Sequence, residues 1–153
     1  MAYDKAKWHF EAEGFPENVG IEQGGVHIAF FYRWMIENGF SGYDMIEEAA
    51  EEVELVKAGK YSALKLLFEF CDGVLLEEDF NDSGASFATQ YYNTKTAFSD
   101  TYSSYLEDYA CLTLSHMNGL ENTDYGILFI DDNYQKVKAI INQRYQEYLS
   151  FIQ

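Results

Sequence analysis

The clearest helical signal in the chain is "EQGGVHIAFFYRWMIENG", Glu22 to Gly39. Its large apolar side chains recur at spacings of three and four residues, so they line one wide face of a helix. That face consists of Val26, His27, Phe30, Phe31, Trp34 and Met35. Asn38-Gly39 follows as a plausible end, because glycine adopts the left-handed conformation that terminates helices. The stretch therefore predicts a helix with a broad packing face.

Two more helical patterns follow directly. Residues 41–60 carry apolar side chains on one face and glutamates on the other, with Ser41 as a candidate N-cap. The like charges on that outer face weaken an isolated helix, so packing or a cation must stabilise it. Residues 62–73 predict a shorter helix that ends near Gly73.

The second half of the chain continues the helical pattern. Asp82 or Ser83 is placed to cap a helix that starts near Ala85, and aromatic spacing over 85–112 predicts one long helix or two joined near Ser99. Residues 116–126 predict a loop, and "YGILFI" at 125–130 is either a short strand or a buried extended segment. The last helix is the most regular, with Asp132 and Gln135 resembling a capping box.

The N-terminal stretch "YDKAKWHFEAEGFPENVG", Tyr3 to Gly20, has no clean helical or strand period. We expect it to pack across the helices as an irregular arm, anchored by Trp8, Phe10 and Phe15. His9 and Glu11 would then face solvent or a site. The predicted fold is mostly α: one helical domain over residues 1–153, with about five to six helices, an irregular arm over residues 1–20 and at most one short extended segment.

The charge of the chain limits its partners. With 26 acidic and 10 basic side chains the formal net charge is −16, which argues against binding nucleic acid or an anionic membrane. Long acidic tracts free of Lys and Arg, interleaved with tyrosine, suit a basic protein surface. Solvated helix faces that only keep the protein soluble are the simpler alternative.

Cysteine usage and hydropathy indicate the compartment. Cys71 and Cys111 form no CxxC motif and are interpreted as small buried residues in a reducing environment. The N-terminus shows no apolar segment of a secretory signal, and no apolar run is long enough to span a bilayer. We therefore expect a soluble, cytoplasmic protein.

No motif in the sequence identifies a catalytic or metal centre. Residues 79–90 match part of a calcium loop, but Gln90 stands where a bidentate glutamate belongs, so a helix-capping turn is the better interpretation. His9, His27 and His116 show no paired ligand spacing. The sequence predicts no metal and no cofactor, and it favours a non-enzymatic protein.

Several of these stretches resemble an uncharacterised family of small acidic bacterial proteins. The resemblance covers most of the chain and is carried by the opening "YDKAKWHFE" followed by Phe15-Pro16, by "GGVHIAFFYRWMIENG", by "CDGVL" and by "QRYQEYLSF". This chain departs from the pattern in a longer segment between Trp8-His9 and Phe15-Pro16, and in a tyrosine-rich second half. The resemblance brings no catalytic residues and implies the company of immunity proteins of toxin systems.

The leading hypothesis is therefore a binding protein, most concretely a bacterial immunity protein that occludes a basic, nuclease-type toxin. The predicted contact residues are Glu47, Glu48, Glu51, Glu52, Glu77, Glu78, Asp79 and Asp82. The alternative is a small-ligand protein or enzyme with a pocket beneath the N-terminal arm, formed by His9, Glu11 and His27. A homodimer joined through the tyrosine-rich helix is a third hypothesis.

Overall fold

The computed structural model of the protein describes residues 1–115 and 124–153, and most of these residues are helical. The prediction of a mostly helical fold is confirmed. The helices, however, are shorter and more numerous than the sequence pattern indicated, because several predicted segments break. His116 and most of the loop predicted over 116–126 lie outside the described residues.

The described elements follow one another in this order: β1 (Ala2–Lys5), α1 (Ala6–Phe10), η1 (Ile21–Gly25), α2 (Val26–Glu37), α3 (Tyr43–Glu48), α4 (Ala50–Lys57), α5 (Ala63–Cys71), β2 (Val74–Leu76), η2 (Glu77–Asp79), α6 (Asp82–Tyr91), α7 (Ala97–Thr101), α8 (Tyr105–Ser115), η3 (Asp124–Gly126) and α9 (Asp131–Phe151). The η elements are single turns of 3₁₀ helix.

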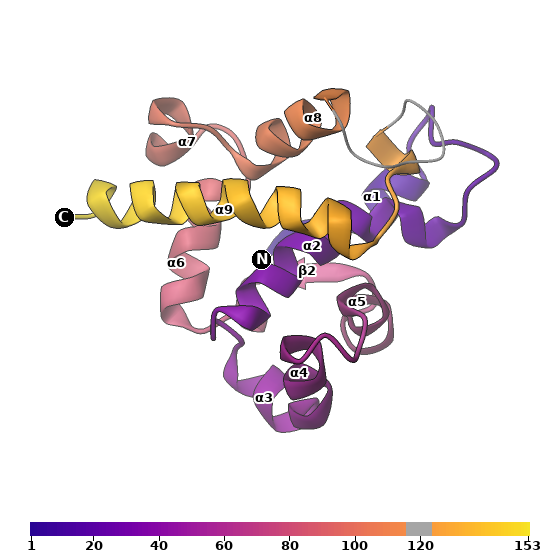
Figure 1. Cartoon of the computed structure of the whole chain (residues 1–153), viewed down its shortest axis with the longest axis horizontal. Coiled ribbons are helices and arrows are strands. Elements are labelled where there is room, and N and C mark those ends of the chain that lie inside the picture. The colour runs from indigo at the N-terminus through magenta and orange to yellow at the C-terminus, as the bar shows by residue number, and fades with distance from the viewer. Residues whose placement is uncertain (116–123) are drawn as a thin grey trace.

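Helix α2 is the centre of the fold (Figure 1). All its residues except Arg33 and Glu37 are buried, so it is a core helix rather than a one-sided surface helix. It packs against α4, α5 and α9, and the long α9 crosses the molecule with α7 and α8 on one side of it. Helices α3 and α4 form the opposite end of the molecule.

The prediction of an irregular arm over residues 1–20 is wrong for the start of the segment, which forms a strand and a short helix. Strand β1 pairs antiparallel with β2, and the register shifts between Ala2 and Asp4. Both Tyr3 and Asp4 are buried, although consecutive strand residues ordinarily face opposite sides. Irregularities of this kind re-aim a side chain, and here one carboxylate is directed into the interior. The sequence shows no alternating strand pattern here because β1 has only four residues.

The predicted aromatic anchors of this segment are partly wrong. The Trp8 side chain is 54% exposed, while Phe10 and Phe15 are half-buried. Tyr3 is the deeper anchor, with its hydroxyl donating to the carbonyl of Ala85 at 3.1 Å. Aromatic identity alone does not say which ring is inside, since a ring on a short surface helix can stay in solvent.

Two predicted helices break where local geometry changes. The helix expected over 41–60 divides at Ala49, whose φ of −132° and ψ of 38° interrupt the helical hydrogen-bond series, and Ser41 does not cap it. The helix expected over 85–112 becomes α6, α7 and α8. Asn81, rather than Asp82 or Ser83, caps α6 by accepting the Gly84 N–H at 2.9 Å. The predicted capping turn is thus confirmed, with a different capping residue.

The C-terminal part agrees better with the sequence. The segment 125–130 matches neither alternative in full, because it begins in the η3 turn and residues 127–130 belong to no named strand. Ile127 is buried, whereas Ile130 is exposed. Helix α9 begins at Asp131 without a side-chain cap, so the expected capping box at Asp132 is absent. Its inward face, with Val137 and Ile141, is buried as predicted.

The prediction that Cys71 and Cys111 are small buried residues is wrong for Cys111 and only partly right for Cys71. Cys71 is half-buried, whereas Cys111 is exposed, and neither forms a disulfide in the described part of the chain. No helix among residues 1–115 and 124–153 combines the length and apolar character needed to cross a membrane.

Candidate functional site

Asp4 is the centre of a buried polar cluster. Its Oδ1 lies 2.7 Å from Nε2 of His9, and its Oδ2 lies 2.9 Å from Nε2 of His27. The two imidazole rings meet edge to face with centroids 4.3 Å apart. Tyr92 donates its hydroxyl to Oδ2 at 2.8 Å, and the backbone N–H of Lys5 donates to Oδ1 at 2.8 Å. We call Asp4, His9 and His27 the Asp-His cluster.

Three separate parts of the chain deliver these side chains. Asp4 ends in the interior because of the irregular register of β1, and His9 follows one helical turn later on α1. His27 lies in the first turn of α2, where Tyr105 donates its hydroxyl to the His27 carbonyl. A Cβ at Gly24 would meet the Ala6 carbonyl oxygen at 2.9 Å, so only glycine lets η1 approach α1 closely enough.

The hydrogen bonds determine the ionisation of Asp4. Burial acts to raise the pKa of the Asp4 carboxyl, because it disfavours the charged form. The hydrogen bonds and positive charge of His27 and His9 outweigh burial and bring the pKa well below its ordinary value. Burial, together with the Asp4 charge, raises the pKa of the Tyr92 hydroxyl far above its ordinary value. The cluster therefore holds a fixed carboxylate with a neutral tyrosine as donor.

A cavity of about 200 Å³ opens beside the cluster. It is lined by His9, His27, Leu106, Tyr109, Ala110 and Tyr125. The Tyr125 hydroxyl lies 2.8 Å from Nδ1 of His9, and the Gln23 amide fixes this segment by donating to the carbonyls of Tyr125 and Ile127, each at 2.9 Å. The cavity thus joins two imidazoles to a mostly apolar wall, an arrangement typical of small-ligand sites.

The sequence-predicted pocket is therefore brought together only in part. His9 and His27 meet, but Glu11 is exposed and pairs with Lys7 at 3.9 Å, so it does not line this cavity. Sequence reasoning missed Asp4, Tyr92 and Tyr125. The proximity of Asp4 to His9 in "YDKAKWH" was a local signal, whereas Tyr92 lies 88 residues away and had none.

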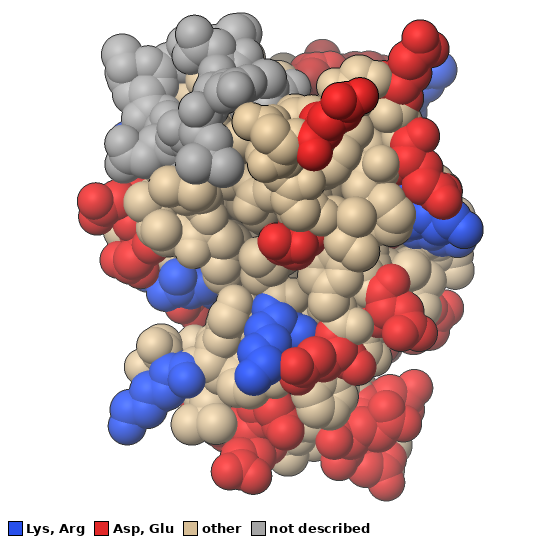
Figure 2. Space-filling model, turned by 90° about the vertical axis from the view of Figure 1, so that its right-hand side faces the viewer, with Lys and Arg blue, Asp and Glu red and all other residues tan. Residues whose placement is uncertain are grey.

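The predicted acidic contact residues form a second candidate region. Glu47, Glu48 and Glu51 are exposed on α3 and α4, and Glu52 is half-buried. Acidic side chains gather at the lower end of the face shown in Figure 2, over α3 and α4. The carboxylates of Glu47, Glu48 and Glu51 are in contact with solvent, so their charges are stable without a binding partner.

A groove of about 350 Å³ is lined by acids from both parts of the chain, with Asp44 from the first acidic stretch and Glu78 and Asp82 from the second. The groove is lined by Tyr43, Asp44, Glu78, Phe80, Asn81 and Asp82, and we call it the acidic groove. The Gly42 N–H donates to the Asp79 carbonyl at 2.7 Å, and Ser41 bridges Phe80, so α3 is fixed against η2. Tyr43 is 76% exposed at this groove, with three carboxylates around it.

Of the eight predicted contact residues, only Glu78 and Asp82 line this groove. The four glutamates Glu47, Glu48, Glu51 and Glu52 lie on α3 and α4 outside its lining, and Glu77 and Asp79 do not line it either. Glu77 is exposed but lines a different cavity, and Asp79 is buried with its Oδ2 accepting the Leu76 N–H at 2.7 Å. Burial raises the pKa of Asp79 to about 6, against the effect of that hydrogen bond. The prediction that Asp79 offers its charge to a partner conflicts with this geometry, because the carboxylate faces inward to cap η2.

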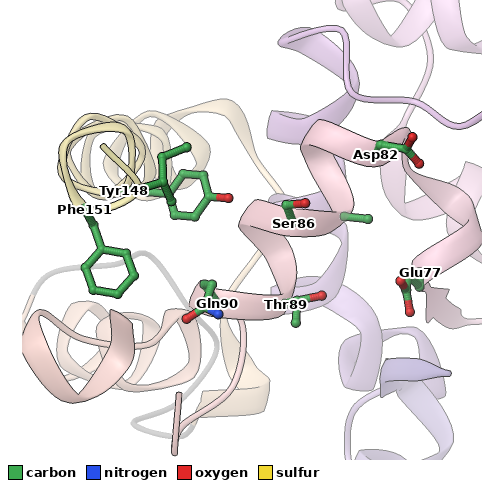
Figure 3. A pocket seen from close by; sticks show the side chains of 9 residues that line it. Glu77, Asp82, Ser86, Thr89, Gln90, Tyr148 and Phe151 are labelled. Atoms are coloured by element: carbon green, nitrogen blue, oxygen red, sulfur yellow. The ribbon is translucent and has the colours of Figure 1, made fainter. Parts of the chain in front are cut away.

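A cavity of about 510 Å³ lies between α6 and the end of α9 (Figure 3). Tyr148 and Phe151 of α9 face Ser86 and Gln90 of α6 across it. Its carboxylates, Glu77 and Asp82, lie toward the opposite end and do not converge on a common point. The cavity offers room but no set of convergent acid–base groups, so it ranks below the other two regions as a site.

The geometry defines a small helical protein with a buried Asp-His cluster beside a cavity and, separately, an exposed acidic groove. The family model described as domain of unknown function DUF7832 matches residues 2–125. The chain belongs to this family, and the match includes the Asp-His cluster and the acidic groove. Comparison with curated proteins and with solved structures gives no match.

Proposed function

We propose that the protein binds a basic protein partner through the acidic groove, and that the partner is a toxin which this chain neutralises as an immunity protein. One observation carries the proposal: Asp44 from residues 41–60 and Glu78 and Asp82 from residues 77–82 line one groove together with the exposed Tyr43 ring. An aromatic anchor ringed by charge is typical of binding hot spots. The resemblance to small acidic bacterial proteins led to the same expectation.

The groove favours a cationic side chain as its occupant. Asp44, Glu78 and Asp82 supply carboxylates, and an arginine or lysine can also stack on the Tyr43 ring. Glu78 pairs only loosely with the N-terminal ammonium, at 3.7 Å and with both groups largely exposed. This surface pair contributes little and leaves Glu78 available. The proposal places the encounter in the cytoplasm, with the net charge of −16 steering the partner.

The test is capture of partners by the tagged full chain from its own cells, washed over a series of salt concentrations. Wild-type protein should retain a basic protein that is released as salt rises. The variant Asp44→Lys/Glu78→Lys should lose it, with association slowed by about tenfold or more. Tyr43→Ala should mainly accelerate dissociation, because it removes the aromatic anchor that the partner would cover.

The matched control is Glu13→Lys/Glu17→Lys, which changes net charge equally at exposed residues outside the groove. If this control loses the captured protein as completely as the groove variant, general charge and not the groove explains binding. Capture that does not respond to either variant also contradicts the proposal.

A second candidate function is small-ligand binding in the cavity beside the Asp-His cluster. It is favoured by the position of His9 and His27 in the wall of a cavity of about 200 Å³. Two imidazole groups in an otherwise mostly apolar wall suit a small aromatic anion. Benzoate is a suitable probe, and its binding should raise the unfolding temperature of the wild-type protein.

The variant Leu106→Trp fills this cavity from its apolar side and should abolish the effect of benzoate. Ala85→Ser, in the wall of the cavity between α6 and α9, is the control and should respond like the wild type. Equal responses in all three proteins would place benzoate elsewhere and sink this candidate.

A further inference from the structure

We propose that the Asp-His cluster binds a divalent transition-metal ion, with Zn²⁺ as the reference ion, through one oxygen of Asp4 and one nitrogen each of His9 and His27. The inference rests on the second candidate function, since it names a group that the cavity site would hold. It comes from tertiary structure, because none of the three histidines has the ligand spacing of a sequence motif.

The distances are close to those of a metal site. The ligand atoms that the three side chains offer all lie within 4.8 Å of one another. A tetrahedral Zn²⁺ keeps its ligands at about 2.0–2.2 Å and therefore roughly 3.3 Å from each other. At present Nε2 of His9 lies 2.7 Å from Oδ1 and Nε2 of His27 lies 2.9 Å from Oδ2, so an ion held by one oxygen requires one imidazole to turn toward that oxygen.

The groups behind the ligands fit the same interpretation. Metal-binding carboxylates are themselves hydrogen-bonded, and Asp4 keeps the Lys5 N–H at 2.8 Å and the Tyr92 hydroxyl at 2.8 Å when an ion replaces its contacts to the imidazoles. These two donors bind one each of Oδ1 and Oδ2 and hold the carboxylate in place. The Asp4 charge is thus fixed before a cation arrives.

Tyr125 lets His9 adopt either tautomer. When Nε2–H of His9 donates to Asp4, Nδ1 accepts a hydrogen bond from the Tyr125 hydroxyl, whose oxygen lies 2.8 Å away. When Nε2 binds a metal, Nδ1–H donates to the same oxygen, because a hydroxyl both donates and accepts. A histidine whose second nitrogen is held in this way is typical of metal centres.

The cavity supplies an open coordination position. His9 and His27 both line it, so an ion bound between them would face about 200 Å³ of space. Three protein ligands and one open position are characteristic of catalytic rather than structural zinc sites. Two histidines with one carboxylate also suit Fe²⁺. An anion that enters the cavity would be placed to take the fourth position.

The test is titration of the metal-free full chain with ZnCl₂ by isothermal calorimetry, and with CoCl₂ by visible absorption, which reports tetrahedral coordination. Wild-type protein should bind one ion per chain. His9→Gln and His27→Gln should each weaken binding by at least a hundredfold, because an amide is a poor zinc ligand. Tyr125→Phe should weaken it by about tenfold, since it removes only the support behind His9.

His116→Gln is the matched control, because it removes the one histidine outside the cluster. It should bind like the wild type. Circular dichroism checks the fold of each variant. If His27→Gln does not fold, His9→Gln decides the result, because His9 lies at the edge of the cluster with 20% of its side chain exposed. Absence of stoichiometric binding by the wild type, or unchanged binding by His9→Gln, overturns the proposal.

A measurement in EDTA separates this inference from the function on which it rests. Stabilisation by benzoate in EDTA, together with no zinc binding, would support the cavity and refute the metal site. Zinc binding without any benzoate effect would do the reverse. Binding that follows the total number of carboxylates instead of the histidines would show an adventitious surface ion and refute the site.

Discussion

Asp4 and Asp79 are both buried carboxylates, yet their surroundings give them opposite ionisation. Asp4 accepts hydrogen bonds from two imidazoles, a tyrosine and a backbone N–H, and its pKa lies well below the ordinary value. Asp79 accepts a hydrogen bond from the Leu76 N–H, and its pKa rises to about 6. Burial acts to raise both pKa values, so the number and charge of the donors decides the difference.

This comparison separates two regions of the molecule. Around Asp4 the fold stabilises a charge in the interior and places it beside a cavity. Around Asp79 the fold uses a carboxylate to close a turn, while its neighbours Glu78 and Asp82 remain in solvent at the acidic groove. A buried acid with several donors is therefore the candidate for site chemistry, and exposed acids are the candidates for partner contact.

The largest effect is expected from Asp4→Ala. The substitution leaves His9, His27 and the Tyr92 hydroxyl without their shared acceptor in the interior. Removing one partner of a buried charged network costs several kcal/mol, and we expect the free energy of unfolding to fall by about 3 kcal/mol. Urea denaturation at pH 7 in EDTA measures it. A loss similar to that of Asp79→Ala would remove the distinction between the two carboxylates.

The acid dependence of stability should show the same distinction. Because the folded-state pKa of Asp4 is depressed, its contribution is present above the unfolded value of about 4 and disappears as the pH falls through the folded value. The free energy of unfolding should therefore decrease steadily below pH 4. Urea titrations between pH 2 and pH 5 follow this loss, which should be smaller in Asp4→Asn than in the wild type.

Asp79→Asn should act in the opposite direction. An acid with a raised folded-state pKa binds more protons in the folded protein, so stability falls as the pH rises from about 4 to about 6. The asparagine carries no charge and should remove this decline, raising the free energy of unfolding at pH 7 by on the order of 1 kcal/mol. Thermal unfolding at pH 4 and pH 7 tests it. A loss of stability at pH 7 that is absent at pH 4 would show instead that the charge is needed at η2.

The smallest effect is expected from Tyr92→Phe. It removes one of four donors from Asp4 and keeps the aromatic ring in the core. One hydrogen bond to a charged group contributes about 1.5 to 3 kcal/mol, and the remaining three donors reduce this to about 1 kcal/mol. Urea denaturation with Tyr105→Phe as a comparison gives the scale, because the Tyr105 hydroxyl binds a carbonyl and not Asp4. A cost above that of Asp4→Ala would contradict the order.

The sequence by itself determined the helical class, the broad apolar face of α2, its end near Asn38-Gly39 and the inward face of α9. These features depend on backbone hydrogen bonds four residues apart and on apolar spacing, so a short window of sequence contains them. It also located both acidic stretches, since charge is read directly from composition.

Only the tertiary structure decided where these pieces meet. His27 reaches Asp4 across 23 residues, Tyr92 across 88, and Asp79 turns inward while Asp82 stays in solvent. The break between α3 and α4 at Ala49 likewise has no glycine or proline that would predict it from the sequence. Contacts between distant segments depend on how whole elements pack, and identical side chains acquire opposite roles according to the donors that packing supplies.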